Sequence, residues 1–104
     1  MNDDELSFEQ QAWLVINAIP YGRVASYGDI ARLAGHPNAA RQIGRILSKL
    51  PEQSKLPWHR VIGQQGTLSL SGERLLCQQE ALRSEGVIIN ERGRVCMKKY
   101  RWQP

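Results

Sequence analysis

The chain has 104 residues, a length that predicts one domain, spanning residues 1–104, with a single modest core. Hydrophobic residues make up 41% and charged residues 23%, which is the composition of a globular rather than a disordered protein. No apolar run reaches the ~20 residues of a membrane span, and no secretory signal pattern is present. We therefore expect a cytoplasmic protein, nucleoid-associated if bacterial, that has no membrane partner.

The cysteine and histidine content and the net charge further limit the classes of protein to which this chain can belong. Two cysteines and two histidines without ligand spacing argue against a disulfide framework and a zinc site, so neither metal nor cofactor is expected. The net charge is +4, and it is unevenly distributed. The N-terminus is acidic and the C-terminal stretch is basic: Asp3, Asp4 and Glu5 against Arg92, Arg94, Lys98, Lys99 and Arg101. This charge is compatible with a nucleic-acid partner and equally with a solubility surface.

The first expected element is a helix over Ser7–Ala18. Ser7 followed by Gln10 is a capping-box pattern that starts a helix. Behind it, apolar residues recur at roughly helical spacing: Phe8, Ala12, Leu14, Val15 and Ala18. The segment Pro20–Gly22 ends this helix, and Val24–Ala25 follows as a candidate short strand.

Two further helices with a tight turn between them are expected next. Ser26 with Asp29 caps the first, which runs to Ala34 and stops at Gly35. Pro37 fits the first position of the second, which Pro51 closes. That helix has a buried stripe and a basic face, respectively Ile43, Ile46, Leu47 and Leu50, and Arg41, Arg45 and Lys49. The pattern is typical of a helix-turn-helix, with a small helical hairpin as the alternative interpretation.

The second half is expected to contain one helix and one hairpin. Leu56–Gly63 is bounded by proline and predicts an extended segment, which leads into a loop over Gln64–Gly72. Glu73–Glu85 predicts a helix with three inward leucines, Leu75, Leu76 and Leu82. Val87–Ile89 and Arg94–Met97 flank a turn and predict a hairpin, which would be a wing. The fold class is mainly α with a small β component, winged helix-turn-helix-like.

Four segments of the sequence together resemble the O6-alkylguanine-DNA alkyltransferases. These segments are Ile19–Gly22, Ser26–Ala31, Ala40–Gly44 and Pro57–Ile62, in the family's order and spacing, and the likeness covers roughly residues 8 to 86. The family motif reads Pro-Cys-His-Arg-Val, and Trp58 stands where its reactive cysteine stands. With the lack of a separate N-terminal domain, this departure resembles the non-repairing branch, the alkyltransferase-like proteins.

The resemblance implies a way of binding DNA. Such proteins dock in the minor groove and flip the target nucleotide into a pocket. Arg41 matches the arginine finger that fills the gap in the base stack, and Tyr27 matches the tyrosine that crowds the target phosphate. Arg45 lies on the same basic face. The small side chains of Ala39 and Ala40 would let the helix lie close to a groove floor, or equally let it pack against another helix.

The resemblance also implies a pocket for alkylated guanine. Val61 matches a residue whose backbone carbonyl receives the base, and the loop of Ser71 and Gly72 resembles the one that closes over the O6 side. Trp58 removes the nucleophile that alkyl transfer requires and adds a large apolar wall, so we expect no enzymatic activity.

Other reactive side chains receive structural roles in this interpretation. His59 and Glu85 match the pair that helps to ionise the family's cysteine, and without that thiol we expect them to form structural hydrogen bonds. Cys77 lies in an expected helix and Cys96 in an expected strand, outside the motif. Both are interpreted as packing or incidental residues.

The sequence and this resemblance together predict a monomeric sensor of DNA damage. It would bind duplex DNA containing O6-alkylguanine without alkyl transfer, and the complex would mark the lesion for nucleotide excision repair proteins. Two alternatives remain open at this stage. One is a winged-helix transcription factor that reads sequence in the major groove, and the other is an alkyltransferase that uses a cysteine outside the motif.

Overall fold

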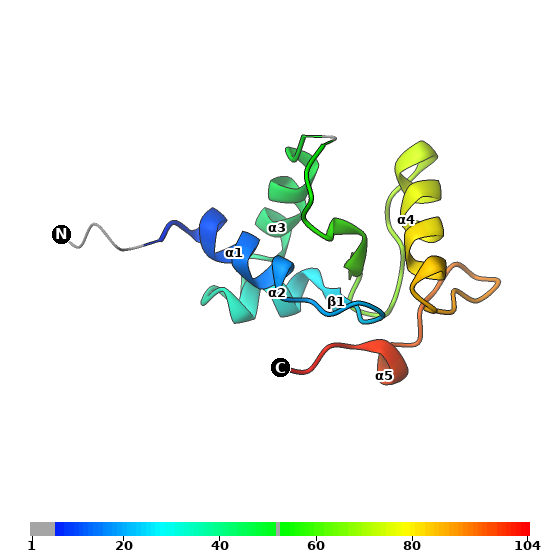
Figure 1. Cartoon of the computed structure of the whole chain (residues 1–104). Helices are drawn as coiled ribbons and strands as arrows, with labels where there is room; N and C mark the ends of the chain where they lie inside the picture. The colour runs from blue at the N-terminus through cyan, green and yellow to red at the C-terminus, as the bar shows by residue number, and fades with distance from the viewer. Residues whose placement is uncertain (1–5, 52) are drawn as a thin grey trace.

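The computed structural model describes residues 6–51 and 53–104, so the acidic residues 3–5 lie outside the described part. Helices predominate, and one two-stranded sheet accompanies them (Figure 1). The expected fold class is thereby confirmed. In chain order the elements are α1 (Phe8–Asn17), β1 (Ala25–Ser26), α2 (Tyr27–Leu33), α3 (Ala40–Ser48), the 3₁₀ turn η1 (Trp58–Arg60), β2 (Val61–Ile62), α4 (Gly72–Ser84) and α5 (Met97–Tyr100).

Helix α1 begins with the expected capping box. The Gln10 amide N donates to Ser7 Oγ at 3.1 Å, and the Ser7 amide N donates to Gln10 Oε1 at 3.0 Å. The buried face consists of Ala12 and Ile16, which are four residues apart and therefore lie one above the other. Leu14 lies two positions from both, on the opposite side, and is 61% exposed. Its assignment to the apolar face was wrong.

Helices α2 and α3 form the expected helix-turn-helix. A second capping box, between Ser26 and Asp29, begins α2. Helix α3 starts at Ala40 and not at Pro37, because the Ala39 amide N donates to the His36 carbonyl at 3.0 Å and closes a turn first. Its buried residues are Ile43, Ile46 and Leu47, and its basic face is exposed as expected.

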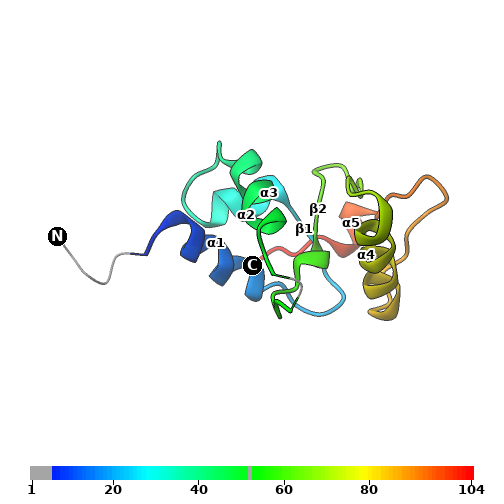
Figure 2. The same ribbon diagram turned by 90° about the horizontal axis from the view of Figure 1, so that it is seen from above.

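The two strands join two halves of the core. They lie side by side (Figure 2). They pair in parallel, with Ala25 opposite Val61 and Ser26 opposite Ile62. Ala25 and Val61 belong to a cluster beneath the helix-turn-helix, whereas Ile62 belongs to a second cluster with Leu82 of α4. The short sheet therefore fixes α4 relative to α2 and α3.

Part of the expected extended segment before β2 is the turn η1. Arg60 donates its amide to the Pro57 carbonyl at 3.0 Å, which closes the 3₁₀ turn. The following helix α4 lies within one residue of its expected bounds. On α4 the buried residues are Gln78 and Leu82, while Leu76 is 62% exposed, so its inward assignment was wrong.

The expected wing is present only as a short turn with isolated bridges. Ile89 pairs with Val95 in antiparallel fashion, and the Asn90 amide donates to the Arg94 carbonyl at 2.9 Å. The expected strand to Met97 is wrong beyond Val95, because Cys96 caps α5 instead. None of the helices over residues 6–51 and 53–104 is long and apolar enough to cross a membrane.

The C-terminal segment returns to the helix-turn-helix. Trp102 donates its amide to the Val24 carbonyl at 2.7 Å, and Arg101 Nε donates to Asp29 Oδ2 at 3.0 Å. Burial opposes ionisation of Asp29, but hydrogen bonds from Arg101 and the Ser26 amide outweigh it and lower the pKa of this carboxyl. The C-terminal segment thereby stabilises the start of α2, whose first residue is Tyr27.

Candidate nucleic-acid interface

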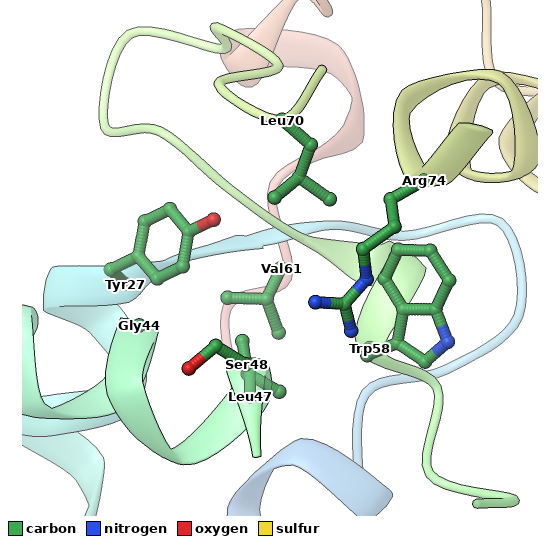
Figure 3. A pocket seen from close by; sticks show the side chains of 8 residues that line it. All are labelled: Tyr27, Gly44, Leu47, Ser48, Trp58, Val61, Leu70 and Arg74. Carbon is green, nitrogen blue, oxygen red and sulfur yellow. The ribbon is translucent and has the colours of Figure 1, made fainter. Parts of the chain in front are cut away.

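A small cavity lies where α2, α3, η1 and the start of α4 meet. Tyr27 and Trp58 lie on opposite sides of Val61 in this cavity (Figure 3). Its volume is about 50 Å³, and since a cavity needs roughly 10–15 Å³ on this scale to hold one water, it has room for a few water molecules, which is less than a flipped guanine requires. The lining residues are Tyr27, Gly44, Leu47, Ser48, Trp58, Val61, Leu70 and Arg74. We call this cavity the base pocket, after the role that the resemblance in sequence implies for it.

The base pocket contains three of the residues singled out from the sequence. Tyr27, Trp58 and Val61 come from three segments that are far apart in the chain. Ser71 and Gly72 do not line the pocket: both are exposed, and Leu70 and Arg74 on either side of them form the wall instead. Ser71 and Gly72 were assigned from the resemblance of their loop to the family's loop, and that resemblance gave no signal for Leu70 and Arg74 beside them.

The turn that carries Trp58 is anchored by its two following residues. His59 Nε2 lies 2.7 Å from Glu85 Oε2, and Arg60 Nη2 donates to the same oxygen at 2.8 Å. Arg60 Nη1 also donates to the Ile19 carbonyl at 2.8 Å. The expected hydrogen-bonding role of His59 and Glu85 is confirmed, with Arg60 as a further member. Residues 59–60 thus hold η1 against the end of α4.

Glu85 is the electrostatic centre of this anchor. Burial opposes its ionisation, but hydrogen bonds from Arg60, the Gly22 amide and His59 outweigh burial and lower its pKa to about 2. The Gly22 amide N lies 2.9 Å from Glu85 Oε1. The carboxylate therefore links the segment after α1 with the segment that carries Trp58.

Gln78 occupies one acceptor site of the Val61 carbonyl. Its side chain is 1% exposed, and Nε2 donates to the carbonyl oxygens of Val61 at 3.2 Å and His59 at 3.3 Å. A carbonyl oxygen has two lone pairs, so Val61 keeps capacity for a second donor. The amide of Gln78 thus braces the backbone that forms one side of the base pocket.

The Trp58 ring also borders a larger, more open recess. Arg74 Cζ lies 5.6 Å from the centre of this ring, a cation–π distance. The recess has a volume of about 490 Å³ and shares Ser48, Trp58 and Arg74 with the base pocket. We call it the outer recess, and its remaining lining residues are Leu50, Pro51, Glu73 and Cys77.

The outward face of α3 carries basic side chains, and the residues at its start have small side chains. Arg41 and Arg45 are exposed, and no carboxylate of residues 6–51 and 53–104 forms an ion pair with either. Ala39 and Ala40 are half-buried, and Ala39 packs against the core beneath the helix-turn-helix. Helix α3 therefore offers Arg41 in its first turn, beside these small side chains, and Arg45 in its last turn, an arrangement suited to the phosphate-rich surface of DNA.

Comparison with known proteins identifies the family. A family model described as the DNA-binding domain of 6-O-methylguanine DNA methyltransferase matches residues 7–87. The DNA base-flipping protein of Escherichia coli is 50% identical over 100 residues, which cover 96% of this chain and 78% of that protein. Alkyltransferase-like protein 1 of Schizosaccharomyces pombe is 36% identical, with 93% of this chain and 95% of that protein covered. The chain belongs to the alkyltransferase-like proteins.

Solved structures agree with this membership. The crystal structure of the Schizosaccharomyces pombe protein in complex with damaged DNA containing O6-carboxymethylguanine superposes with a TM-score of 0.84 at 36% identity and covers 100% of both chains. The O6-methylguanine methyltransferase of Mycobacterium tuberculosis superposes with a TM-score of 0.68 at 37% identity. That match covers 78% of this chain but 49% of the methyltransferase. The alkyltransferase-like chain thus shares the methyltransferase's DNA-binding part.

Proposed function

We propose that this chain is a DNA-damage sensor that binds O6-alkylguanine in duplex DNA and leaves the alkyl group in place. The observation that carries the proposal is the position of Trp58. Its ring forms one wall of the base pocket. By the resemblance in sequence, it stands in the motif position that a reactive cysteine occupies in the alkyltransferases. An indole can contact an alkyl group but cannot accept it as a thiolate does.

The other cysteines do not replace the missing nucleophile in this proposal. Cys77 lines the outer recess and not the base pocket, and Cys96 caps α5. A transfer reaction requires its reacting atoms about 3–3.5 Å apart and aligned. Neither sulfur lies on the wall of the base pocket where the substituent of a flipped guanine would be.

Helix α3 is the element that we propose docks in the minor groove. Arg41 would enter the base stack as the finger, Arg45 would contact phosphates, and Ala39 and Ala40 would allow close approach. Guanidinium suits the finger role because it is planar, permanently charged and able to stack. The Escherichia coli relative is named for base flipping, and the Schizosaccharomyces pombe relative is solved with damaged DNA, which supports this mode.

The flipped guanine would enter the base pocket between Tyr27 and Trp58. Because the pocket volume is about 50 Å³ without DNA, its walls must separate when the base enters. The most exposed wall is the segment from Leu70 to Arg74, which contains Ser71 and Gly72. We propose that this segment moves and then closes over the O6 side. Extrusion costs a few kcal/mol, less for a damaged base, which favours lesions.

Lesion binding would be the first step of a repair process. We propose that the protein acts as a single-domain monomer in the cytoplasm, or at the nucleoid of a bacterium. Its complex with the lesion would mark the site for nucleotide excision repair proteins. In this scheme the protein contributes recognition, while others remove the damaged strand.

A binding titration tests the proposal. One duplex is prepared with and without a single O6-methylguanine, and both are titrated at two stated salt concentrations, because phosphate contacts make affinity salt-dependent. We expect tighter binding to the modified duplex at both concentrations. Equal affinity for the two duplexes, together with a preference for particular base sequences, would instead support a transcription factor.

A further inference from the structure

Arg74 is the one charged side chain among the eight residues that line the base pocket. It also lines the outer recess, so it stands at the boundary between the two spaces, with its guanidinium directed toward Trp58 (Figure 3). No carboxylate in the described ranges 6–51 and 53–104 lies within ion-pair distance of it. The cation is therefore available to a group that enters the pocket.

Several neighbouring polar groups are already engaged, and the Tyr27 hydroxyl, which also lines the pocket, is uncharged. His59 and Arg60 both bind Glu85, and the Ser48 hydroxyl donates to the Arg45 carbonyl at 2.8 Å. The remaining charged residue nearby is Glu73, which lines the outer recess but not the base pocket. A substituent that extends past Trp58 would thus meet one cation at the boundary.

The start of α4 adds to this positive field. The helix begins at Gly72, and its N-cap Ser71 makes no side-chain hydrogen bond to the first turn. Uncapped amide N–H groups carry positive partial charge at a helix start, which favours an anion there. The partial charge of the helix start supplements the full charge of Arg74.

We propose that Arg74 selects O6 substituents that end in an anionic group, such as a carboxylate, over neutral substituents of the same size. The proposal rests on the proposed function, because it requires a flipped guanine whose O6 side faces Trp58. A guanidinium presents a planar fork of donors that matches a carboxylate. The outer recess, at about 490 Å³, gives the end of a longer substituent room beside that fork.

The test compares two matched adducts in one duplex sequence. O6-carboxymethylguanine carries the carboxylate, and O6-carbamoylmethylguanine is its neutral amide of nearly equal shape; O6-methylguanine and guanine complete the set. The variants are Arg74→Gln, Arg74→Lys and Arg83→Gln, the last of which removes an exposed arginine from the same helix, outside the pocket lining. Arg83→Gln therefore controls for the general loss of one positive charge toward DNA.

For the wild type we expect about fivefold tighter binding of the carboxymethyl adduct than of the carbamoylmethyl adduct, the scale of one partly exposed ion pair. Arg74→Gln should abolish this ratio, Arg74→Lys should retain part of it, and Arg83→Gln should retain all of it. The preference for O6-methylguanine over guanine should persist in Arg74→Gln.

Two results would overturn the proposal. One is an unchanged ratio in a folded Arg74→Gln variant. The other is an equal gain in affinity for all adducts in that variant, which would make Arg74 a plug over Trp58. Failure of the proposed function looks different, since the wild type itself would then bind O6-methylguanine and guanine duplexes equally.

Discussion

The hydrogen bond between His59 Nε2 and Glu85 Oε2, 2.7 Å long, joins the turn that carries Trp58 to the end of α4. The sequence resemblance implies that the matching pair serves a thiol in the alkyltransferases, and in this chain the two side chains hydrogen-bond to each other and hold a turn. The contact stabilises the folded protein, because the buried Glu85 carboxylate would be an unpaired charge if its donors were removed. The contact therefore fixes the turn whose Trp58 ring lines the base pocket.

Replacing the carboxylate of this anchor should destabilise the fold. In Glu85→Gln, the Arg60 guanidinium loses its charged partner while it stays largely buried. We expect the free energy of unfolding to fall by about 2–4 kcal/mol, as for other buried ion pairs with one partner removed. Urea denaturation followed by tryptophan fluorescence measures this change. An unchanged midpoint would show that the anchor contributes nothing to stability.

The same residue makes stability depend on pH in acid. The pKa of Glu85 is lowered from 4.5 to about 2 in the folded state. The ionised form is therefore favoured by folding, and its contribution is present above pH 4.5 and is lost as the pH falls toward 2. Asp29, whose pKa is also lowered, adds to the same trend. The stability difference between wild type and Glu85→Gln should narrow over this interval, and a constant difference would contradict the assignment.

Removing the proposed finger should weaken DNA binding without loosening the fold. Arg41→Ala is expected to reduce affinity for modified and unmodified duplexes by about 1–3 kcal/mol, the scale of one good arginine contact. Arg41 is exposed on α3, so the melting temperature of the variant should equal that of the wild type. Arg83→Ala, an exposed arginine of α4, is the matched control for charge. Equal losses in the two variants would remove any special role for Arg41.

Tyr27 should act on extrusion of the base rather than on general affinity. Its ring lines the base pocket and packs partly against the core beneath the helix-turn-helix. Tyr27→Ala is expected to reduce lesion preference more than binding to unmodified duplex, because phosphate contacts supply most of the latter. A fluorescent base analogue at the lesion reports extrusion, and Tyr27→Phe controls for lost packing. Wild-type extrusion in a folded Tyr27→Ala protein would refute the role.

The indole of Trp58 should contribute directly to lesion preference. Trp58→Ala removes one wall of the base pocket, and stacking of a base on an aromatic side chain is worth about 1–3 kcal/mol. We expect the affinity ratio between modified and unmodified duplex to fall accordingly, whereas Trp58→Phe should retain most of it. If both variants bind the lesion as the wild type does, the base does not meet this ring.

The elements with local causes could be predicted from the sequence, and those with distant causes could not. Ser7 and Ser26 begin helices through capping boxes that four consecutive residues define, so both starts were correct. Pro37 suggested an early start for α3, but a turn closed by His36 delayed it to Ala40. Gln78 could not be predicted as a buried residue, because a glutamine that hydrogen-bonds to two carbonyls distant in sequence does not contribute to an apolar pattern.

The candidate site divides in the same way. Tyr27, Trp58 and Val61 came from the resemblance, and the structure brings them to one cavity. Arg74 lies outside the four segments that resemble the family. It reaches the cavity because the sheet positions α4 beside it. That placement depends on pairing across 36 positions of sequence, between Ala25 and Val61, which no local pattern encodes.

The most direct measurement concerns the fate of the alkyl group. Wild-type protein is incubated in excess with a duplex that contains one O6-methylguanine, and both molecules are then weighed by mass spectrometry. The account predicts that the protein mass is unchanged and that the methyl group stays on the guanine, because on the proposed assignment Trp58 stands where the alkyltransferases have their nucleophile. A protein heavier by one methyl-for-hydrogen exchange, with unmodified guanine left in the DNA, would contradict the account and make this chain an alkyltransferase.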